Sequence, residues 1–482
     1  MNRSELIAEL TALLGAAAVI HQREALVTYD CDANTIDKAD PDVVVLPRST
    51  DEVAAVVRLA SEHQIPFVAR GAGTGLSGGA IALRGGIMIA LTRMKAILWI
   101  DLASRQALVQ VGLVNLHLTN AVTANGYCYA PDPSSQGVCT IGGNVAENSG
   151  GPHTLKFGVT TNHVLALEVV LPSGEVVWLG GAERGARAAV DAPGYDLIGV
   201  FVGSEGTFGI ATRAIVRLVH QPERTCTLLA IFDQFDAGAQ AVSAIIAAGI
   251  IPAALEMIDQ PCIVALEETF KLGFPINAEA ILLVETDGQA DAAEEELRRV
   301  IAICNEQGAR EVRVAQNERE RMLLWKARKG AFAALSRLAK SYYTQDGVVP
   351  RSKLSEILRT IRAIGARHRI RIANVFHAGD GNLHPCLLFD EQDPDEVQRC
   401  LEAGTDILKA CVDIGGSVTG EHGIGVEKIE LMNYAFTPAT LQAMRDLRSV
   451  FNPDGLCNPL KVVPINNVCV ERRYLKRAAL AV

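Results

Sequence analysis

The chain of 482 residues lacks a long uninterrupted hydrophobic run and contains no C-x-x-C pair, although 49% of its residues are hydrophobic and 11 are cysteine. Its apolar run from Ala244 to Leu255 is broken by Gly249 and Pro252 and is too short to cross a bilayer. Scattered cysteines exclude an iron–sulfur cluster built on the usual cysteine runs and favour reduced, mostly buried thiols. We therefore expect a cytoplasmic protein without a transmembrane segment.

The N-terminus also lacks a secretion signal, because Met1–Leu10 carries both charge signs and no apolar run that ends in small residues. Acidic residues outnumber basic ones by 55 to 45, and this formal net charge of −10 argues against general affinity for nucleic acid. Only the tail after Val470, with Glu471–Arg473 and Lys476–Arg477, is locally basic. We interpret it as a solvated end rather than a docking site.

The first part of the chain predicts a β-α-β unit. Ser49 and Glu52 form a capping box, in which Ser49 reaches forward and Glu52 reaches back, and the box opens a helix. Hydrophobic periodicity predicts a helix from Ser4 to Ala17, a strand from Val43 to Leu46, the capped helix to Gln64, a strand from Ile65 to Ala69, short strands at 86–91, 96–100 and 107–111, and a hairpin of 165–171 with 175–179.

The pattern changes near residue 220, where we place the main domain boundary. Long amphipathic helices are predicted at 290–306, 318–340, 353–368, 393–414 and 438–451, with strands such as 280–285 and 371–376 between them. A chain of 482 residues is too long for one hydrophobic core. Alternating strands and helices of this kind predict an α+β domain with an antiparallel sheet.

A glycine-rich loop follows the predicted strand at 65–69 and runs from Arg70 to Gly79. Glycines allow successive backbone N–H groups to converge on a pyrophosphate, and Thr74 and Ser77 can add hydroxyl donors. The loop is not a dinucleotide-binding G-x-G-x-x-G turn, because no helix follows it, and it contains no P-loop lysine. A tight structural turn is the alternative reading of this loop alone.

Two further loops, at 131–151 and 201–210, also mix glycine with small polar residues and contain almost no cationic side chain. Such surfaces suit a long, flat ligand that needs many backbone hydrogen bonds and little countercharge. Three such loops in one domain therefore predict a site for a phosphate-bearing cofactor.

Residues 40–218 resemble the FAD-binding domain of the vanillyl-alcohol-oxidase flavoprotein family. The motifs are P-R-S-T-D-E-V at 47–53, R-G-A-G-T-G at 70–75, I-G-G-N at 141–144 and G-S-E-G-T-F-G-I at 203–210. No His or Cys occurs between Arg70 and Met94, which predicts non-covalent FAD. The resemblance implies that the pyrophosphate is held by Arg70, Gly71, Ala72, Gly73, Thr74, Gly75 and Ser77, the flavin and ribityl chain by Pro131, Ser135, Gly142, Gly143 and Asn148, and the adenine side by Glu205, Gly206, Gly209 and Ile210.

A histidine–carboxylate pattern forms the second candidate site. His377 and His384 are seven residues apart across a turn rich in Gly, Asp and Asn, so a hairpin would bring their rings together. Glu421 and His422 are flanked by glycine further on. Two histidines and one carboxylate make a plausible set of three ligands for a divalent metal with a position left open for substrate. For any single histidine the alternative is an ordinary core or surface residue.

This half resembles the C-terminal domain of FAD-linked D-2-hydroxy-acid dehydrogenases, most closely the glycolate oxidase flavoprotein subunits and D-lactate dehydrogenases. The motifs are H-A-G-D-G-N-L-H at 377–384, G-E-H-G-I-G at 420–425 and F-N-P-D-G-L-C-N-P-L-K at 451–461. The resemblance implies that His377, His384 and Glu421 bind the metal, that His422 is the catalytic base, that Arg328 binds the substrate carboxylate, and that Asn458 lies near the flavin.

Three positions depart from D-2-hydroxyglutarate dehydrogenases. Phe332 and Thr344 stand where those enzymes carry a threonine and a lysine for the distal carboxylate, and Pro385-Cys386 stands where an asparagine follows the second metal histidine. A site without a second cationic group should prefer a monocarboxylate. D-2-hydroxyglutarate oxidation remains the alternative activity, and a non-catalytic flavin-binding subunit of an oxidase complex is an alternative of another class.

The sequence thus predicts an α+β protein with a two-part FAD-binding domain and a substrate, or cap, domain made of an antiparallel sheet and helices. The predicted parts are a helical segment at 1–39, the FAD-binding domain at 40–218, the cap domain at 219–450 and a segment at 451–482 that returns to the FAD domain. We expect oxidation of glycolate or D-lactate, an iron–sulfur acceptor subunit or a quinone as partner, and peripheral association with the inner membrane only through that partner.

Overall fold

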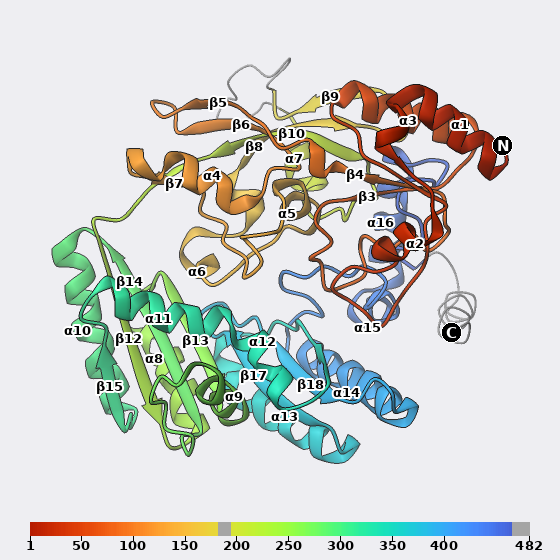
Figure 1. The fold of residues 1–482 in the computed structure, drawn as a ribbon. Coiled ribbons are helices and arrows are strands. Elements are labelled where there is room, and N and C mark those ends of the chain that lie inside the picture. The colour runs from red at the N-terminus through yellow and green to blue at the C-terminus, as the bar shows by residue number, and fades with distance from the viewer. Residues whose placement is uncertain (182–193, 465–482) are drawn as a thin grey trace. The chain divides into compact units, whose positions relative to one another are not determined.

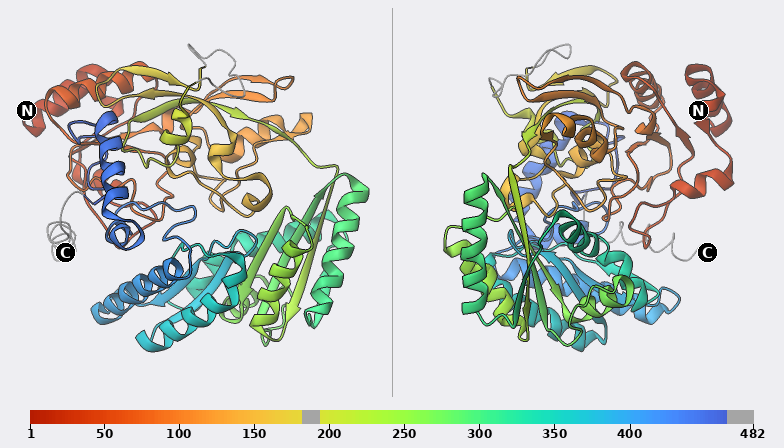
Figure 2. Two further views of the ribbon diagram at one scale, coloured as in Figure 1. Left: turned by 180° about the vertical axis from the view of Figure 1, so that it is seen from behind. Right: turned by 60° about the vertical axis from the view of Figure 1, so that its left-hand side comes forward.

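The structure is a computed structural model that describes residues 1–181 and 194–464 (Figure 1). The basic tail predicted to be a solvated end lies outside these residues. The chain packs as two compact units, which Figure 2 shows in two further views. Among the described residues, the first unit comprises 1–150, 159–181, 194–221 and 422–464, and the second comprises 151–158 and 222–421.

A small mixed sheet opens the first unit, with the strand order β1-β2-β4-β3. Strand β2 (Val43–Val45) and strand β3 (Phe67–Arg70) each pair parallel with β4 (Ile87–Ala90), and β1 (Val19–Ile20) pairs antiparallel with β2. Helix α3 (Thr50–Glu62) connects β2 to β3 and gives the predicted β-α-β unit. All three β2 residues and all four β4 residues are buried, as the apolar runs predict.

The predicted capping box at the start of α3 is half formed. Ser49 Oγ accepts a 3.2 Å hydrogen bond from the backbone N–H of Glu52, as expected. The Glu52 carboxylate, however, accepts from the backbone N–H of Arg48 at 2.7 Å and not from that of Ser49. The carboxylate thus reaches one residue further back than the reciprocal pattern assumes.

A second sheet in the first unit has the order β5-β6-β10-β8-β9, and every neighbouring pair is antiparallel. Its hydrophobic core also includes residues from α1, α3 and α5. Its strands are β5 (Ile97–Asp101), β6 (Gln106–Gln110), β8 (Val164–Val170), β9 (Val176–Leu179) and β10 (Ile210–Arg217). The other elements of this unit are α1 (Arg3–Leu14), α2 (Arg23–Leu26), α4 (Asn115–Val122), β7 (Tyr127–Cys128), α5 (Ile141–Glu147), α7 (Leu197–Phe201), β11 (Val219–His220), α15 (Met432–Ala435) and α16 (Pro438–Phe451).

The second unit is built on an antiparallel sheet that has seven strands among the described residues, in the order β15-β12-β14-β13-β17-β18-β16. The strands are β12 (Arg224–Phe232), β13 (Ala254–Asp259), β14 (Ala280–Gly288), β15 (Glu311–Val314), β16 (Ser341–Thr344), β17 (Arg371–His377) and β18 (Pro385–Phe389). This arrangement confirms the predicted antiparallel sheet.

Helices pack against both faces of this sheet (Figure 1). One face is covered by α8 (Phe235–Ala247), α10 (Ala290–Glu306), α13 (Leu354–His368) and α14 (Pro394–Asp413). The other face contacts α9 (Gln260–Phe270), against which α12 (Ala331–Ala334) packs, and α11 (Glu318–Lys329) precedes α12. The short helix α6 (Thr154–Phe157) also belongs to this unit.

Two predicted helices are longer than the observed ones. The helix predicted at 318–340 is interrupted at Gly330, whose ψ of 0° departs from helical geometry, so α11 ends at Lys329 and the short α12 begins at Ala331. The helix predicted from Ser4 to Ala17 ends at Leu14, because the following Gly15 has a φ of +82°. In both cases a glycine ends a helix that hydrophobic spacing alone would continue.

The second unit ends at Glu421, before the predicted cap-domain boundary at residue 450. Residues 422–450 therefore pack in the first unit, although their helical pattern resembles that of the preceding domain. Periodicity predicts an amphipathic helix but does not identify the partner that covers its apolar face.

Within residues 1–181 and 194–464, the helices are too short or too polar to cross a bilayer. The cysteines of these residues are all free, and most of them are buried.

Candidate functional site

The glycine-rich loop after β3 lies half-buried, with residues 71–76 neither exposed nor fully covered. Among the described residues, the backbone N–H groups of Ala72 to Leu76 donate no hydrogen bond to a protein acceptor. Gly73 has a φ of +72°, and a Cβ there would overlap the guanidinium of Arg70. A row of unpaired N–H groups in a half-buried loop fits a phosphate-bearing ligand.

Arg70 supports the same interpretation. Its side chain is 8% exposed, and its Nη1 is buried without a hydrogen-bond partner among the described residues. A buried guanidinium N–H without an acceptor is costly unless a ligand supplies one. An anionic ligand in the loop would therefore satisfy both the backbone donors and this side chain.

Helix α5 packs directly against the loop. Thr140 caps α5 by accepting a 3.2 Å hydrogen bond from the Gly143 N–H, and its Oγ1 would lie 2.5 Å from a Cβ at Gly71. Gly142 lies against Val111, whose Cβ would be 2.7 Å from an added side chain. Glycine at these positions is therefore required by close packing as well as by any ligand.

Other residues predicted to contact FAD lie in the same unit, and the structure shows a backbone role for several of them. Pro131 accepts from the amide of Asn115 at 3.0 Å, and Asn148 ends α5 with a φ of 54°. Gly209 has a φ of +144°, which favours glycine at the start of β10. Ser135 lies in a turn, Gly206 accepts from Cys457, and Ile210 is buried in β10.

The polar side-chain groups of Glu205 and Asn458 form hydrogen bonds with backbone groups of the protein. The two carboxylate oxygens of Glu205 accept from the N–H groups of Ile424 and Gly425, each at 2.6 Å. Asn458 donates from Nδ2 to the carbonyl oxygens of Gly79, at 2.9 Å, and Glu205, at 2.6 Å. Their side chains therefore join three loops of the first unit.

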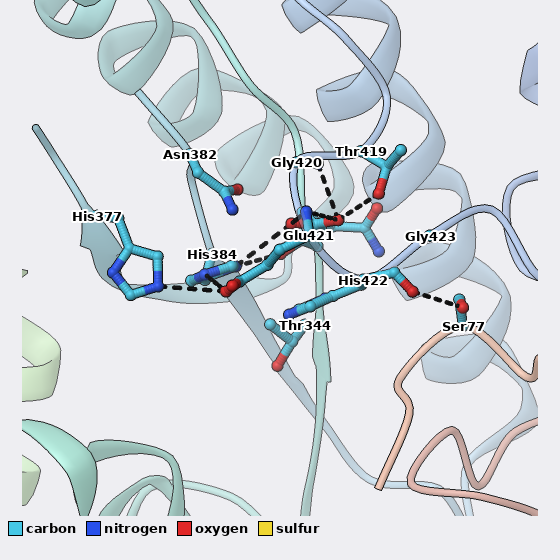
Figure 3. Close-up of polar contacts among 12 residues, drawn as sticks. Ser77, Thr344, His377, Asn382, His384, Thr419, Gly420, Glu421, His422 and Gly423 are labelled. Atoms are coloured by element: carbon cyan, nitrogen blue, oxygen red, sulfur yellow. Dashed lines mark hydrogen bonds and ion pairs between the residues drawn. The ribbon is translucent and has the colours of Figure 1, made fainter. Parts of the chain in front are cut away.

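The loop that begins at His422 is fixed at two points by the first unit. Ser77 Oγ donates to the His422 carbonyl oxygen at 2.8 Å (Figure 3), and the Ser77 carbonyl oxygen accepts from the N–H of Val426 at 2.9 Å. Gly425 has a φ of +52°, and a Cβ there would overlap the Ser77 carbonyl group. Together with Glu205, these contacts determine the backbone path after the predicted base.

The second unit brings the three predicted metal ligands together. Glu421 Oε1 lies 3.2 Å from His377 Nε2 and 3.2 Å from His384 Nε2 (Figure 3). The two imidazole rings have centroids 5.1 Å apart and meet edge to face. Because β17 ends at His377 and β18 begins after His384, the antiparallel pairing of these strands produces the predicted approach.

This donor set fits a divalent metal. Ligands about 2.0–2.2 Å from a tetrahedral zinc lie roughly 3.3–3.5 Å apart, close to the observed separations. One ligand atom of each of the three residues lies within 4.8 Å of the others, and His377 and His384 are buried. Three protein ligands would leave a coordination position for substrate.

The other nitrogen of each ring is anchored. His377 Nδ1 lies 2.7 Å from Glu256 Oε1, and His384 Nδ1 lies 3.3 Å from the carbonyl oxygen of Gln345. Both partners are acceptors, so each Nδ1 carries the hydrogen and each Nε2 is directed toward Glu421. Partners of this kind orient histidine ligands in metal sites.

Asp346 fixes the backbone that carries Glu421. Its buried carboxylate accepts from the hydroxyl of Thr419 at 2.5 Å and from the N–H groups of Gly420, at 3.0 Å, and Glu421, at 3.3 Å. A Cβ at Gly420 would lie 2.5 Å from the side chain of Asn382. The glycine before Glu421 is therefore needed for this turn to pack against the histidine hairpin.

The predicted substrate arginine is connected to this cluster through a buried carboxylate. Arg328, on α11, is 1% exposed and donates from Nε to Glu256 Oε2 at 2.7 Å. Its Nη2 also forms an ion pair with Glu256, whereas Nη1 has no hydrogen-bond partner among the described residues. A terminal guanidinium nitrogen with N–H groups to donate fits the carboxylate of a small acid.

The charges of this cluster shift the pKa values in opposite directions. Burial raises the pKa of Glu421, but the charge of His377 and hydrogen bonds from both histidines hold it well below its usual range. Burial lowers the pKa of His377, yet Glu256 and Glu421 raise it well above the ordinary value. The carboxylates of Glu256 and Glu421 therefore favour positive charge between them. A divalent cation bound to the cluster would supply such a charge.

Sequence reasoning missed Glu256 and Asp346. Glu256 interrupts the apolar residues of the strand Ala254–Asp259 and is fully buried, and a carboxylate between apolar neighbours was the available signal. Asp346 is also fully buried and lies two residues after the end of β16. Its role gives no sequence signal, because its partners at 419–421 are remote along the chain.

Comparisons with known proteins agree with both halves of this description. The family model described as "FAD binding domain" matches residues 41–180, and the one described as "FAD linked oxidases, C-terminal domain" matches residues 221–462. The glycolate oxidase subunit GlcD of Escherichia coli K12 is 43% identical over 471 residues, which cover 98% of this chain and 93% of that protein. GlcD of Bacillus subtilis is 42% identical over 90% of this chain and 92% of that protein.

More distant proteins match over similar lengths. A D-lactate dehydrogenase of Anaerostipes hadrus is 33% identical over 88% of this chain and 90% of that protein. Among solved structures, p-cresol methylhydroxylase with bound substrate superposes with a TM-score of 0.82 and covers 96% of this chain and 98% of that chain. Its 16% identity supports the fold alone. The chain belongs to the FAD-linked oxidases, a family of FAD-dependent oxidoreductases, and has the vanillyl-alcohol-oxidase type of fold.

Proposed function

We propose that this chain oxidises a small D-2-hydroxy acid, glycolate or D-lactate, to the 2-oxo acid and passes the electrons to an external acceptor. The observation that carries the proposal is the buried cluster in the second unit, where a metal-type donor set and an arginine with unpaired N–H groups share Glu256. Relatives named glycolate oxidase subunit and D-lactate dehydrogenase support the substrate class.

The residues that hold FAD are those of the glycine loops. Arg70 and residues 71–76 bind the pyrophosphate, and their unpaired donors support this assignment, whereas the hydroxyl that Ser77 was predicted to offer donates to the His422 carbonyl oxygen. Non-covalent attachment follows from the lack of His and Cys between Arg70 and Met94. When bound there, FAD would supply flavin N5 as the acceptor for hydride, that is, for the α-hydrogen with its two electrons.

The protein's own groups prepare the substrate for that transfer. Arg328 binds the carboxylate through its guanidinium, whose Nη1 has no partner among the described residues. His377, His384 and Glu421 would hold a divalent, zinc-like metal, which when bound would supply Lewis acidity toward the substrate hydroxyl. His422 takes the hydroxyl proton as general base. His422 is the next residue after Glu421, so their Cα atoms are about 3.8 Å apart across the trans peptide bond. The proposed base is therefore always close to the backbone of a proposed metal ligand.

The surroundings of Arg328 and the histidines support a small monocarboxylate. The ring of Phe332 lies edge to face with the imidazole of His384, with centroids 6.2 Å apart. Thr344 pairs with Cys386 across β16 and β18, and both side chains are buried. These positions place apolar or weakly polar groups where a dicarboxylate would need a cation, so D-2-hydroxyglutarate should be the poorer substrate.

We propose that the electron acceptor is an iron–sulfur subunit or a quinone. The word "subunit" in the names of the GlcD relatives supports assembly with a partner, and the chain has no C-x-x-C run that would hold a cluster of its own. We place the protein in the cytoplasm, with peripheral attachment at the inner membrane through that partner.

The test is an anaerobic titration of the purified yellow protein with glycolate, D-lactate, L-lactate and D-2-hydroxyglutarate. We expect glycolate or D-lactate to bleach the flavin absorbance, L-lactate to fail, and D-2-hydroxyglutarate to require a much higher concentration. Bleaching by D-2-hydroxyglutarate alone would replace the proposed substrate, and bleaching by none would exclude this chemistry.

The His422→Gln variant separates an enzyme from a flavin-binding subunit without chemistry. The variant should retain bound FAD and lose bleaching, because its amide cannot accept the hydroxyl proton. Wild-type rates in this variant would refute the assignment of the base.

A further inference from the structure

Glu256 is a buried carboxylate between two apolar side chains at the centre of β13. It is fully buried, and its neighbours Leu255 and Met257 belong to the hydrophobic interior. Burying a carboxylate costs desolvation free energy unless both oxygens have hydrogen-bond or ionic partners that offset it. Both oxygens are paired, Oε2 with Arg328 and Oε1 with His377.

We propose that Glu256 is a positioning residue that orients the substrate arginine and a metal ligand together. The inference rests on the proposed function. One carboxylate fixes the guanidinium plane of Arg328 through Oε2 and the imidazole of His377 through Oε1, both at 2.7 Å. The separation of the carboxylate-binding and hydroxyl-binding ends of the site is therefore determined by a single side chain.

On the arginine side, Glu256 determines which edge of the guanidinium is presented. Arg328 Nε donates to Glu256, and because the guanidinium is planar, this bond fixes the direction of Nη1 and Nη2. Nη2 also forms an ion pair with Glu256, and Nη1 has no hydrogen-bond partner among the described residues. The Arg328 guanidinium is thus oriented before the acid binds, and this preorganisation reduces the entropy lost on binding.

On the histidine side, Glu256 determines the tautomer. A carboxylate can only accept, so His377 Nδ1 carries the hydrogen and Nε2 is the nitrogen available to a metal. The pairing of β13 with β17 places Glu256 directly opposite His377 in the sheet. The strand register therefore builds this contact without help from a loop.

The decisive variant is Glu256→Gln. An amide offers one acceptor and one donor group, whereas Arg328 Nε and His377 Nδ1 both donate. The glutamine must leave one of them unsatisfied, or accept the other tautomer of His377 and remove the lone pair from Nε2. Chelator-treated holoprotein should bind Zn²⁺ about 10–100-fold more weakly by calorimetry, and the KM for the oxidised acid should rise at least about tenfold.

Asp259→Asn is the matched control, since Asp259 is a second buried carboxylate on β13 that contacts neither Arg328 nor His377. It accepts from the amide of Asn374 at 2.7 Å, and the buried Oδ1 of Asn374 has no partner among the described residues. Rotation of the Asn374 amide would restore a hydrogen bond to the new asparagine. The control should keep wild-type Zn²⁺ affinity and KM.

If the Glu256→Gln variant does not fold, the Glu256→Asp variant tests the positioning role. Aspartate keeps the charge and both acceptors but withdraws them by one methylene, so a role limited to charge compensation predicts wild-type values. The positioning role predicts weaker Zn²⁺ binding and a higher KM with FAD retained. Wild-type values of both in a folded Glu256 variant would overturn the proposal. If the wild-type protein oxidises none of the acids, the proposed function fails, while Zn²⁺ affinity still tests Glu256.

Discussion

The hydroxyl group of Ser77 donates a 2.8 Å hydrogen bond to the backbone carbonyl oxygen of His422. Ser77 lies in the loop predicted to hold the pyrophosphate, and His422 is the proposed base, so one residue connects two functions within the first unit. The carbonyl oxygen of Ser77 adds a second contact to the same segment through Val426.

Ser77→Ala should slow the chemistry without releasing FAD. A single neutral hydrogen bond contributes about 1 kcal/mol, so we expect the first-order rate of anaerobic flavin bleaching to fall roughly fivefold. The flavin-to-protein ratio measures cofactor retention. Ser449→Ala is the control, because the exposed Ser449 bonds only to the Asp446 carbonyl oxygen of its own helix. An unchanged rate in Ser77→Ala would show that this contact does not position the base.

Gly425→Ala should lower the stability of the fold far more than an alanine at another glycine whose only constraint is a positive φ. Gly425 has a φ of +52°, and an added Cβ would overlap the Ser77 carbonyl group. Gly455 in the same unit has a φ of +66° with no atom within 4 Å of an added Cβ. Gly455→Ala should therefore cost about 1–2 kcal/mol of stability. We expect Gly425→Ala to lower Tm much further and to lose FAD; equal Tm values would contradict the predicted clash.

Removing the metal should abolish most activity while the flavin stays bound. After dialysis against a chelator, we expect kcat/KM to fall at least about 100-fold, because the metal supplies several kcal/mol of charge stabilisation. Zn²⁺ or Mn²⁺ should restore the wild-type protein but not His384→Ala. His368→Ala serves as the control, since His368 pairs with Asp406 at 2.8 Å. Full activity in metal-free protein would exclude a catalytic metal.

The stability of the second unit should depend on pH through Asp259. Burial raises the pKa of Asp259 to about 6, above the value of about 3.9 in an unfolded chain. A raised carboxyl pKa means that the folded state holds the proton more tightly, so its stabilising contribution is complete below about pH 4 and is lost as pH rises through 6. The loss amounts to roughly 2–3 kcal/mol.

The measurement is the difference in unfolding free energy between wild type and Asp259→Asn at pH values from 4 to 7.5. Asparagine does not titrate, so the variant should gain stability relative to wild type as the pH rises across this range. A difference that stays constant with pH would show that Asp259 is ionised throughout.

The candidate sites were largely predictable where the chemistry lies in short motifs. The spacing of His377 and His384 predicted a hairpin, and the structure confirms that the two rings meet. The glycine loop at 70–79 predicted convergent N–H groups, and the structure leaves those of Ala72 to Leu76 unpaired among the described residues. Both features depend on local backbone geometry, which neighbouring residues determine.

The sequence by itself thus determined the antiparallel sheet of the second unit, the glycine loops and the identity of the metal-type donors, because periodicity and turn chemistry act over a few residues. Only the tertiary structure decided that Glu256 joins Arg328 to His377, that Asp346 holds the Glu421 turn, and that the chain from His422 onward packs in the first unit. These contacts join residues some 70 to more than 300 positions apart. No local pattern encodes them, because they depend on which buried surfaces the whole chain can bring together.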